Sequence, residues 1–201
     1  MKALTQIVLL GTGTPGPDPD RSGPATAIVV NGRPYLVDFG PGVVRRAAAA
    51  YRKGVKAFGF GVTNLKTAFL THLHADHTAG YPDLILTPWI MGRRQPLEVY
   101  GPKGLKAMTK HVLKAWELDI ANRVRGAERL PGAGCSVNVS EIEPGLIYKD
   151  SNVSVTAFLV HHGGMENAFG FRSRRRTRQS SFRATPRQPK ASSKIAAAAT
   201  C

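Results

Sequence analysis

The sequence predicts an α/β fold in a single domain. Short apolar runs rich in β-branched residues, which are typical of strands, recur along the first 160 residues. Segments with apolar residues three and four positions apart, which are typical of helices, lie between some of these runs. The length of 201 residues, with 42% hydrophobic and 20% charged residues, fits one globular domain and excludes wholesale disorder.

The first half of the chain contains most of the predicted strands. They are residues 4–10, 25–31, 34–39 and 66–71. The first two are bounded by clusters of Gly, Pro and Asp, and the Asn31-Gly32 pair between the second and third is typical of a hairpin turn. Residues 41–53 begin with Pro-Gly, contain four consecutive alanines and end before a glycine, which predicts a helix.

The second half begins with a partly helical segment, residues 78–92, whose extent we expect Pro82 and Pro88 to limit. Residues 102–117 form the clearest amphipathic helix, and His111 lies on its polar side as an ordinary surface residue. Its expected buried stripe is Leu105, Met108, Val112, Leu113 and Trp116. The remaining predicted strands are residues 95–101, 136–142 and 152–160.

The basic residues are unevenly distributed. The net charge is +15, but residues 172–201 hold nine of the 28 Lys and Arg residues and no acidic residue. This segment has only two large apolar residues and no periodicity, so we expect a disordered basic tail after a domain of residues 1–171. An alternative is a phosphate-contacting arm of a nucleic-acid-binding protein, although Phe182 is the tail's one aromatic residue.

Other features exclude whole classes of protein. No run of about 18 apolar residues is present, so no transmembrane helix and no membrane partner are expected. The apolar N-terminal stretch is short and lacks a small-x-small cleavage site, which favours a cytoplasmic location. The two cysteines, Cys135 and Cys201, exclude a disulfide framework and a cysteine-based zinc site.

Four potential metal ligands lie within the segment HLHADH. His72 and His74 are two residues apart at the end of a predicted strand, so their side chains can point the same way. Asp76 and His77 follow on the turn and can reach an adjacent point. Imidazole and carboxylate without thiolate suit zinc, with manganese or iron as alternatives. The segment therefore predicts parts of two neighbouring metal sites.

HLHADH resembles the HxHxDH signature of the metallo-β-lactamase superfamily. Three further segments agree with that family in order and spacing and resemble its ribonuclease Z-like and arylsulfatase-like branch: LLGTGTPGPDPDRSGPATAIVV, LVDFGPG and EVYGPKGL. The resemblance covers about residues 4–171. It implies an αββα sandwich with the metals at one edge, and a hydrolase that cleaves an ester or a phosphodiester with a metal-bound hydroxide.

The resemblance also assigns roles to the motif residues. It implies that His72 and His74 hold the first zinc and that Asp76 and His77 hold the second. Asp76 is further implied to orient the attacking hydroxide and so to be catalytic.

The third ligand of the first zinc is implied to come from LVHHGGMENAFGFR. There His162 fits the family's position, and His161 is one residue away from it. Asp38, in LVDFGPG, is expected to orient a ligand histidine or, alternatively, to cap the helix that begins near Pro41.

Two further ligands of the family would follow this region: an aspartate in an SGDT-like strand end and a final histidine. The chain contains neither residue type after Met165, so we expect one bound zinc rather than two. Codons for residues 172–190 can be chosen so that another reading frame encodes an apolar strand ending in SGDT. We therefore hypothesise a frameshifted and truncated chain, which the gene sequence would test.

The truncation predicts a chain with an incomplete second half. We expect it to expose an apolar sheet face that includes residues 152–160, and hence to be poorly soluble or molten with little activity. Small phosphodiesters, sulfate esters and lactones all remain open as substrates. The shifted frame leaves no room for a substrate-gripping arm, which weighs against tRNA processing. A homodimer, and a non-enzymatic remnant that binds one metal at most, also remain open.

Overall fold

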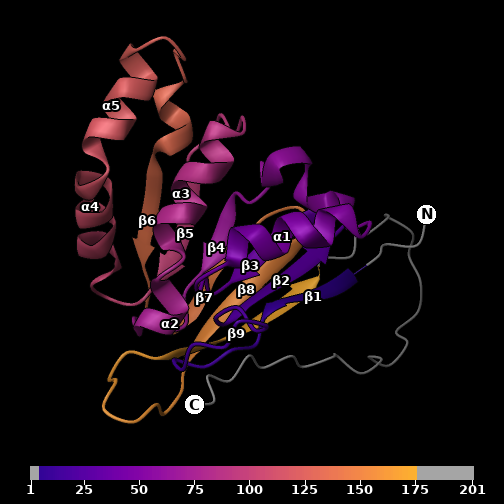
Figure 1. Ribbon diagram of the computed structural model, residues 1–201. Coiled ribbons are helices and arrows are strands. Elements are labelled where there is room, and N and C mark those ends of the chain that lie inside the picture. The colour runs from indigo at the N-terminus through magenta and orange to yellow at the C-terminus, as the bar shows by residue number, and fades with distance from the viewer. Residues whose placement is uncertain (1–4, 176–201) are drawn as a thin grey trace.

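Helices cover one face of a six-stranded sheet, and a three-stranded sheet packs on its other face (Figure 1). This computed structural model describes residues 5–175. The strands are β1 (Thr5–Gly11), β2 (Ala25–Val30), β3 (Arg33–Val37), β4 (Thr67–Phe69), β5 (Leu97–Gly101), β6 (Val137–Glu141), β7 (Gly145–Lys149), β8 (Val153–Leu159) and β9 (Phe169–Arg175). The α-helices are α1 (Val43–Arg52), α2 (Ala75–Thr78), α3 (Tyr81–Ile90), α4 (Leu105–Ala115) and α5 (Glu117–Arg125), and short 3₁₀ turns are η1 (Lys56–Phe58), η2 (Phe60–Val62) and η3 (Gly132–Cys135).

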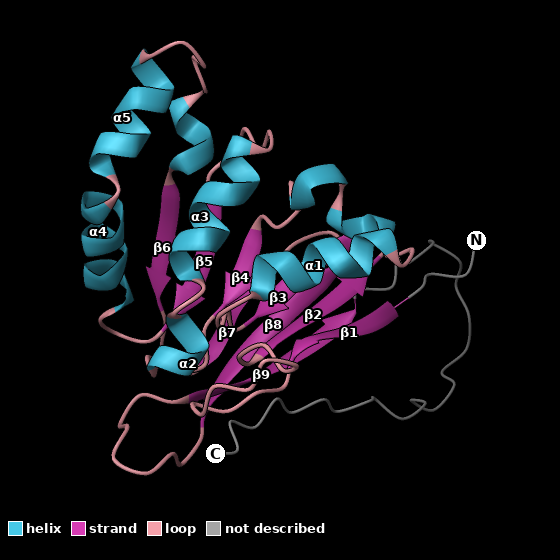
Figure 2. Cartoon of the chain, in the orientation of Figure 1, coloured by secondary structure: helices cyan, strands magenta, loops and turns pink. Residues whose placement is uncertain are grey.

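The order of the large sheet explains where its loops gather. Its strands follow the chain order from β1 to β6, and the first three are antiparallel whereas β3 to β6 run parallel (Figure 2). Because β3 and β4 are parallel neighbours, the loops that leave them start at the same edge of the sheet. These loops carry Asp38 and the HLHADH segment, so the topology brings the two predicted site segments together.

Two apolar cores lie on the two faces of this sheet. Leu36 and Ala68 face the helices and belong to the larger core. Tyr35, Val37 and Phe69 face the smaller sheet and form the second core with its strands. The central strands are thus apolar on both faces, which is why they read as continuous apolar runs in the sequence.

A polar cluster also joins the smaller sheet to the larger one, at the end of β8 away from the histidines. Asp150, in the turn between β7 and β8, accepts hydrogen bonds from the hydroxyls of Tyr35 (2.6 Å) and Tyr148 (2.9 Å). Arg33 lies 3.1 Å from the same carboxylate. Burial raises the pKa of Asp150, but these and two backbone hydrogen bonds outweigh it and hold the pKa below its usual value. The cluster ties β3 to β8, whose other end leads to the histidines of the site.

The expected exposure of the apolar face of β8 is wrong. Val153, Val155 and Ala157 are buried between the two sheets, and the alternate residues Ser154, Thr156 and Phe158 face outward. Within residues 5–175, three layers of the αββα sandwich are present: helices, the six-stranded sheet and the three-stranded sheet. The expected reason for poor solubility is therefore absent on this face.

The expected start of disorder after Phe171 is also wrong. β9 continues to Arg175, where it pairs with Val153 at the start of β8. The remainder of the basic tail, and with it the frameshift hypothesis, lies outside the described residues.

Helix α3 differs from the prediction because it runs through Pro88. A proline has no N–H, so the carbonyl of Leu84 loses its partner within the helix. The guanidinium of Arg93 donates to that carbonyl at 3.0 Å and thereby replaces the missing bond. The basic side chain that makes this helix continuous carries no local signal in the sequence.

The predicted amphipathic helix of residues 102–117 is α4, which ends at Ala115, and a further helix, α5, follows from Glu117. Leu105 is buried as expected, but Trp116, at the junction, is 40% exposed. His111 is exposed, as its place off the stripe indicates. No helix in the described part of the chain is long and apolar enough to span a bilayer.

Candidate metal centre

Three histidine rings from two segments meet at the edge of the sandwich. His72 and His74 lie between β4 and α2, and His162 lies between β8 and β9. A ring nitrogen of each lies within 4.8 Å of the others. His74 Nδ1 is 3.1 Å from His72 Nε2 and 3.2 Å from His162 Nε2. A proton on His74 Nδ1 can satisfy only one of these two nitrogens, so lone pairs remain facing one another, as they do around a cation.

His72 is held neutral and in one tautomer. It is fully buried, and burial, followed by the charges of the neighbouring histidines, lowers its pKa to about 4. The hydroxyl of Thr71 donates its single proton to the carboxylate of Asp38 at 2.9 Å, so it accepts from His72 Nδ1, also 2.9 Å away. The lone pair of His72 Nε2 is then directed at the other two ring nitrogens, which is the state in which histidine binds zinc.

Asp38 orients this segment through several hydrogen bonds. Its carboxylate accepts from the Thr71 backbone N–H at 2.8 Å and lies 2.9 Å from His77 Nδ1. Asp38 itself has a φ of 59°, a left-handed conformation that residues other than glycine seldom adopt. Helix α1 is capped at Gly42 with no side-chain hydrogen bond, so the alternative that Asp38 caps this helix is wrong.

His77 and Asp76 form a second, smaller pair. His77 Nδ1 lies 2.9 Å from Asp38 Oδ2, and its Nε2 lies 3.5 Å from Asp76 Oδ2. An imidazole nitrogen and a carboxylate oxygen are both ligand types that zinc takes. Both residues lie outside the three-histidine group. Two ligands alone leave the usual four positions of zinc half filled.

Glycines allow the backbones around the motif to pack closely. A β-carbon on Gly40 would lie 2.4 Å from the carbonyl oxygen of Asp76, and one on Gly80 would lie 2.3 Å from the carbonyl oxygen of Gly40. A β-carbon on Gly23 would lie 2.8 Å from the same Asp76 carbonyl oxygen. The segment that precedes α1 therefore touches the backbone of α2 and of Gly80 just after it, and this contact supports the loop that carries the ligands.

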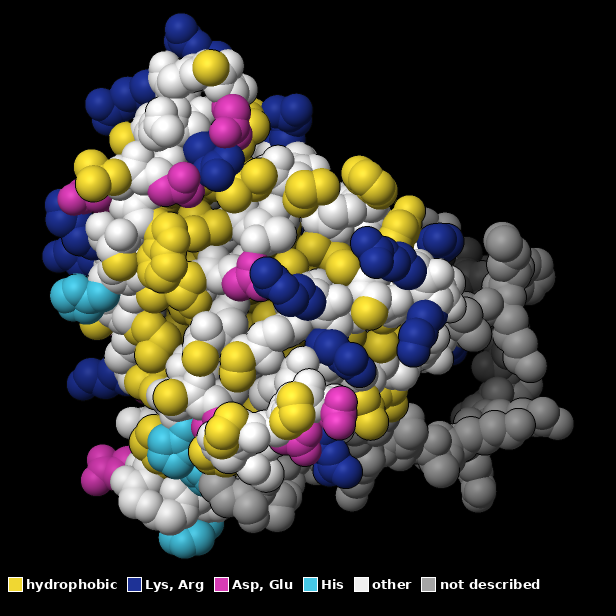
Figure 3. All heavy atoms as spheres, viewed as in Figure 1, with side chains coloured by type: hydrophobic (Ala, Val, Ile, Leu, Met, Phe, Trp, Pro, Cys, Tyr) yellow, Lys and Arg dark blue, Asp and Glu magenta, His cyan; other side chains and the backbone are white. Residues whose placement is uncertain are grey.

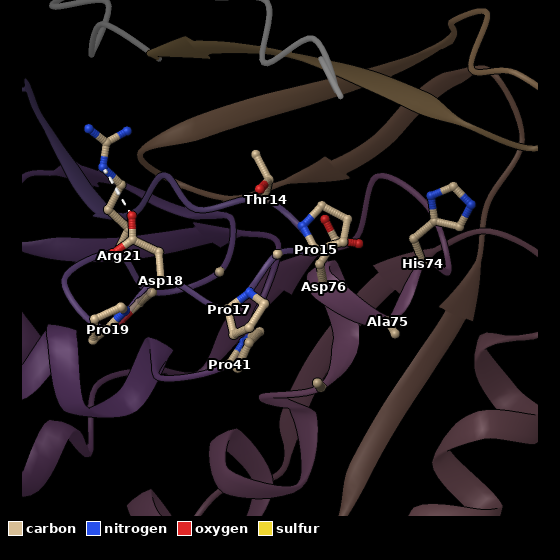
Figure 4. Close-up of a pocket in the computed structure, with 14 residues that line it drawn as sticks. Thr14, Pro15, Pro17, Asp18, Pro19, Arg21, Pro41, His74, Ala75 and Asp76 are labelled. Carbon is tan, nitrogen blue, oxygen red and sulfur yellow. Dashed lines mark ion pairs between the residues drawn. The ribbon is translucent and has the colours of Figure 1, made fainter.

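A hollow opens beside the histidines. It has a volume of about 920 Å³ and is lined by His74 and Asp76 on one side and by residues of the β1–β2 loop on the other. Figure 4 shows Arg21 and Asp18, paired at 3.8 Å, at the end of the hollow away from His74. A group bound in this hollow would lie against the candidate metal ligands.

The other candidate residues lie apart from the centre or at its rim. His161 is exposed and is not part of the three-histidine group. Cys135 is buried in η3, far along the chain from the motif, and Cys201 lies outside the described residues. Sequence reasoning missed Thr71, whose hydroxyl connects Asp38 to His72. The signal that would have found it is a hydroxyl residue directly before the first motif histidine.

Comparisons with known proteins agree with this architecture. The chain is 36% identical to the ribonuclease Z of Mycobacterium marinum over 172 residues, which are 84% of this chain and 58% of that protein. Human tRNase Z, short form, superposes with a TM-score of 0.61 at 25% identity and covers 84% of this chain and 63% of its own. The metallo-β-lactamase fold protein YhfI of Bacillus subtilis gives a TM-score of 0.59 at 13% identity, over 84% of this chain and 56% of its own, which bears on the fold alone.

The chain spans less than two thirds of the length of these relatives. Of the two branches that its glycine-rich opening resembles, the ribonuclease Z branch is the one that these relatives represent. The family model described as the beta-lactamase superfamily domain matches residues 33–192, which include β3 to β9 and all the candidate ligands. The chain therefore belongs to the beta-lactamase superfamily.

Proposed function

We propose that this chain binds one divalent metal, with zinc preferred, through His72, His74 and His162, and that its chemistry is phosphodiester hydrolysis. The observation that carries the proposal is the convergence of three imidazole nitrogens beside an open hollow. Bound zinc supplies Lewis acidity toward a phosphoryl oxygen and lowers the pKa of water. The substrate class that we propose is RNA, since the named relatives are a ribonuclease Z and a tRNase Z.

The chain's own residues prepare this chemistry. Asp38 and Thr71 hold the ring of His72 and leave its Nε2 free of a proton. Asp76 lines the hollow next to His74, so we propose that its carboxylate orients the attacking water and accepts its proton.

A cytoplasmic location and a homodimer, both of which the sequence leaves open, are further proposals for this chain.

We propose a single-metal state because, within residues 5–175, Asp76 and His77 belong to no group of three residues that could hold a metal ion. The sequence has no histidine or aspartate after Met165 to complete that pair. We therefore expect turnover to be slow, since the second metal of a two-metal site would stabilise the leaving oxygen.

The test is hydrolysis of bis-p-nitrophenyl phosphate by the full chain, before and after removal of metal with a chelator. We expect slow hydrolysis that chelation abolishes and zinc restores. Replacing Asp76 by Ala should lower kcat/KM by about 100-fold or more, because general-base catalysis contributes on the order of 10²–10⁴. The matched control is His111→Ala, on the exposed side of α4, which should keep the rate. Hydrolysis that survives chelation, or that Asp76→Ala leaves intact, would contradict the proposal.

A further inference from the structure

Helix α1 carries an exposed basic surface that the candidate centre does not use. Its sequence, VVRRAAAAYR, buries Val43, Val44 and Ala47 against the sheet. The exposed cations on and just after the helix are Arg45, Arg46, Arg52 and Lys53. Figure 3 shows Lys and Arg side chains gathered over this part of the molecule.

Most of this positive charge is uncompensated. Arg45 pairs with Asp83 of α3 at 3.3 Å. Arg46, Arg52 and Lys53 form no ion pair with any residue of the described range 5–175. Uncompensated cations on one helix attract a polyanion, because each neutralised phosphate releases a condensed counterion.

The cations also enclose a shallow hollow of about 380 Å³. Its walls are Arg45 at one end and Arg52 and Lys53 at the other, and its floor is Ala48 and Ala49. Arg45 and Arg52 are seven residues apart, or about 10 Å along the helix axis at about 1.5 Å per residue. The alanines leave room between the long side chains for a bulky anionic group. A guanidinium is well matched to the oxygens of a phosphate.

The N-terminal end of α1 lies beside the candidate centre. Pro41, which lines the hollow beside His74 and Asp76, lies two residues before α1 begins. An RNA strand whose reactive phosphodiester lies at the histidines could therefore extend its sugar-phosphate backbone along α1.

We infer that the α1 surface, defined as the exposed cations Arg46, Arg52 and Lys53, binds the phosphate backbone of the RNA on which the candidate centre acts. This inference rests on the proposed function for the identity of the polyanion. It assigns RNA affinity to the folded domain, in addition to any affinity of the basic tail.

The test is binding of a fluorescent tRNA precursor with a 3′ trailer to the metal-free full chain, measured over a series of salt concentrations. The variant is R46Q/R52Q/K53Q. The matched control is K103Q/K106Q/K110Q, which removes three exposed lysines at α4, at the opposite end of the sheet from α1. Thermal melts check that both variants remain folded, and the tail is unchanged in all three chains.

We expect the α1 variant to bind at least about 10-fold more weakly and the slope of log affinity against log salt to fall by about 2 to 3, at roughly 0.7–0.9 per lost phosphate contact. The control should change affinity less than about twofold. Equal losses in both variants, or no loss in the α1 variant, would overturn the inference. The binding assay uses metal-free protein, so its result does not depend on whether the chain hydrolyses a phosphodiester.

Discussion

Replacing Gly40 by Ala is expected to destabilise the fold and to displace the ligand loop. The added β-carbon would lie 2.4 Å from the Asp76 carbonyl oxygen, 2.6 Å from the Gly23 carbonyl carbon and 2.8 Å from the Pro24 nitrogen. All three atoms belong to the backbone, so no side-chain rotation relieves the overlap. We expect a loss of about 3 kcal/mol in the free energy of unfolding, at the upper end of the usual cost of overpacking.

The measurement is urea unfolding of the metal-free chain, followed by zinc titration of the folded variant. Gly132→Ala is the matched control, since a β-carbon there meets nothing within 4 Å. We expect the control to keep the stability of the parent and Gly40→Ala to lose both stability and zinc affinity. If Gly40→Ala melts and binds zinc like the control, the close backbone contact does not support the centre.

Replacing Arg93 by Met is expected to have a similar or larger effect on stability. Arg93 is 1% exposed, and burial lowers its pKa to about 10, so it remains charged at neutral pH. Its guanidinium donates to four backbone carbonyls, those of Leu65, Leu84, Ile85 and Gly134, at 3.0, 3.0, 2.7 and 3.1 Å. Met keeps an unbranched apolar stem but lacks the guanidinium, so these carbonyls lose their donor, which should cost about 3–5 kcal/mol.

The neighbouring Arg94 provides the control, because it is exposed. Arg94→Met should change the free energy of unfolding by no more than about 0.5 kcal/mol. Arg93→Lys keeps the charge but loses the fork of donors, so it should lie between the two. An Arg93→Met variant as stable as Arg94→Met would mean that these carbonyls find other partners.

The sequence contains enough information to predict the strands and the motif. Apolar β-branched runs ending in Asp38 and in HLHADH predict two strand ends. Their parallel pairing brings the two ends together. The sequence does not show which tertiary contacts a polar side chain makes, and these contacts decide between its alternative roles. Asp38 could cap α1 or orient a histidine, and only its packing against Thr71 and His77 separates the two.

Tertiary contacts also explain the elements that the sequence misplaces. Pro88 predicts a helix end by itself, and it is tolerated within α3 because Arg93 donates to the Leu84 carbonyl that the proline leaves without a helical partner. The sequence predicts that the apolar face of β8 is exposed to solvent, because the second half of the domain is expected to be incomplete. In the fold it packs on the face of β3 and β4 that carries Val37 and Phe69. The first outcome depends on a side chain nine residues after the carbonyl that it binds, and the second depends on strands far from β8 along the chain.

The central claim is that His72, His74 and His162 hold one metal ion. Its most direct test is the zinc content of the purified full chain by mass spectrometry, alongside two neighbouring variants. We expect about one tightly bound zinc in the parent and in His161→Ala, whose ring lies outside the three-histidine group, and loss of most of it in His162→Ala. Two tightly bound zinc ions in the parent, or zinc retained in His162→Ala and lost in His161→Ala, would contradict the account.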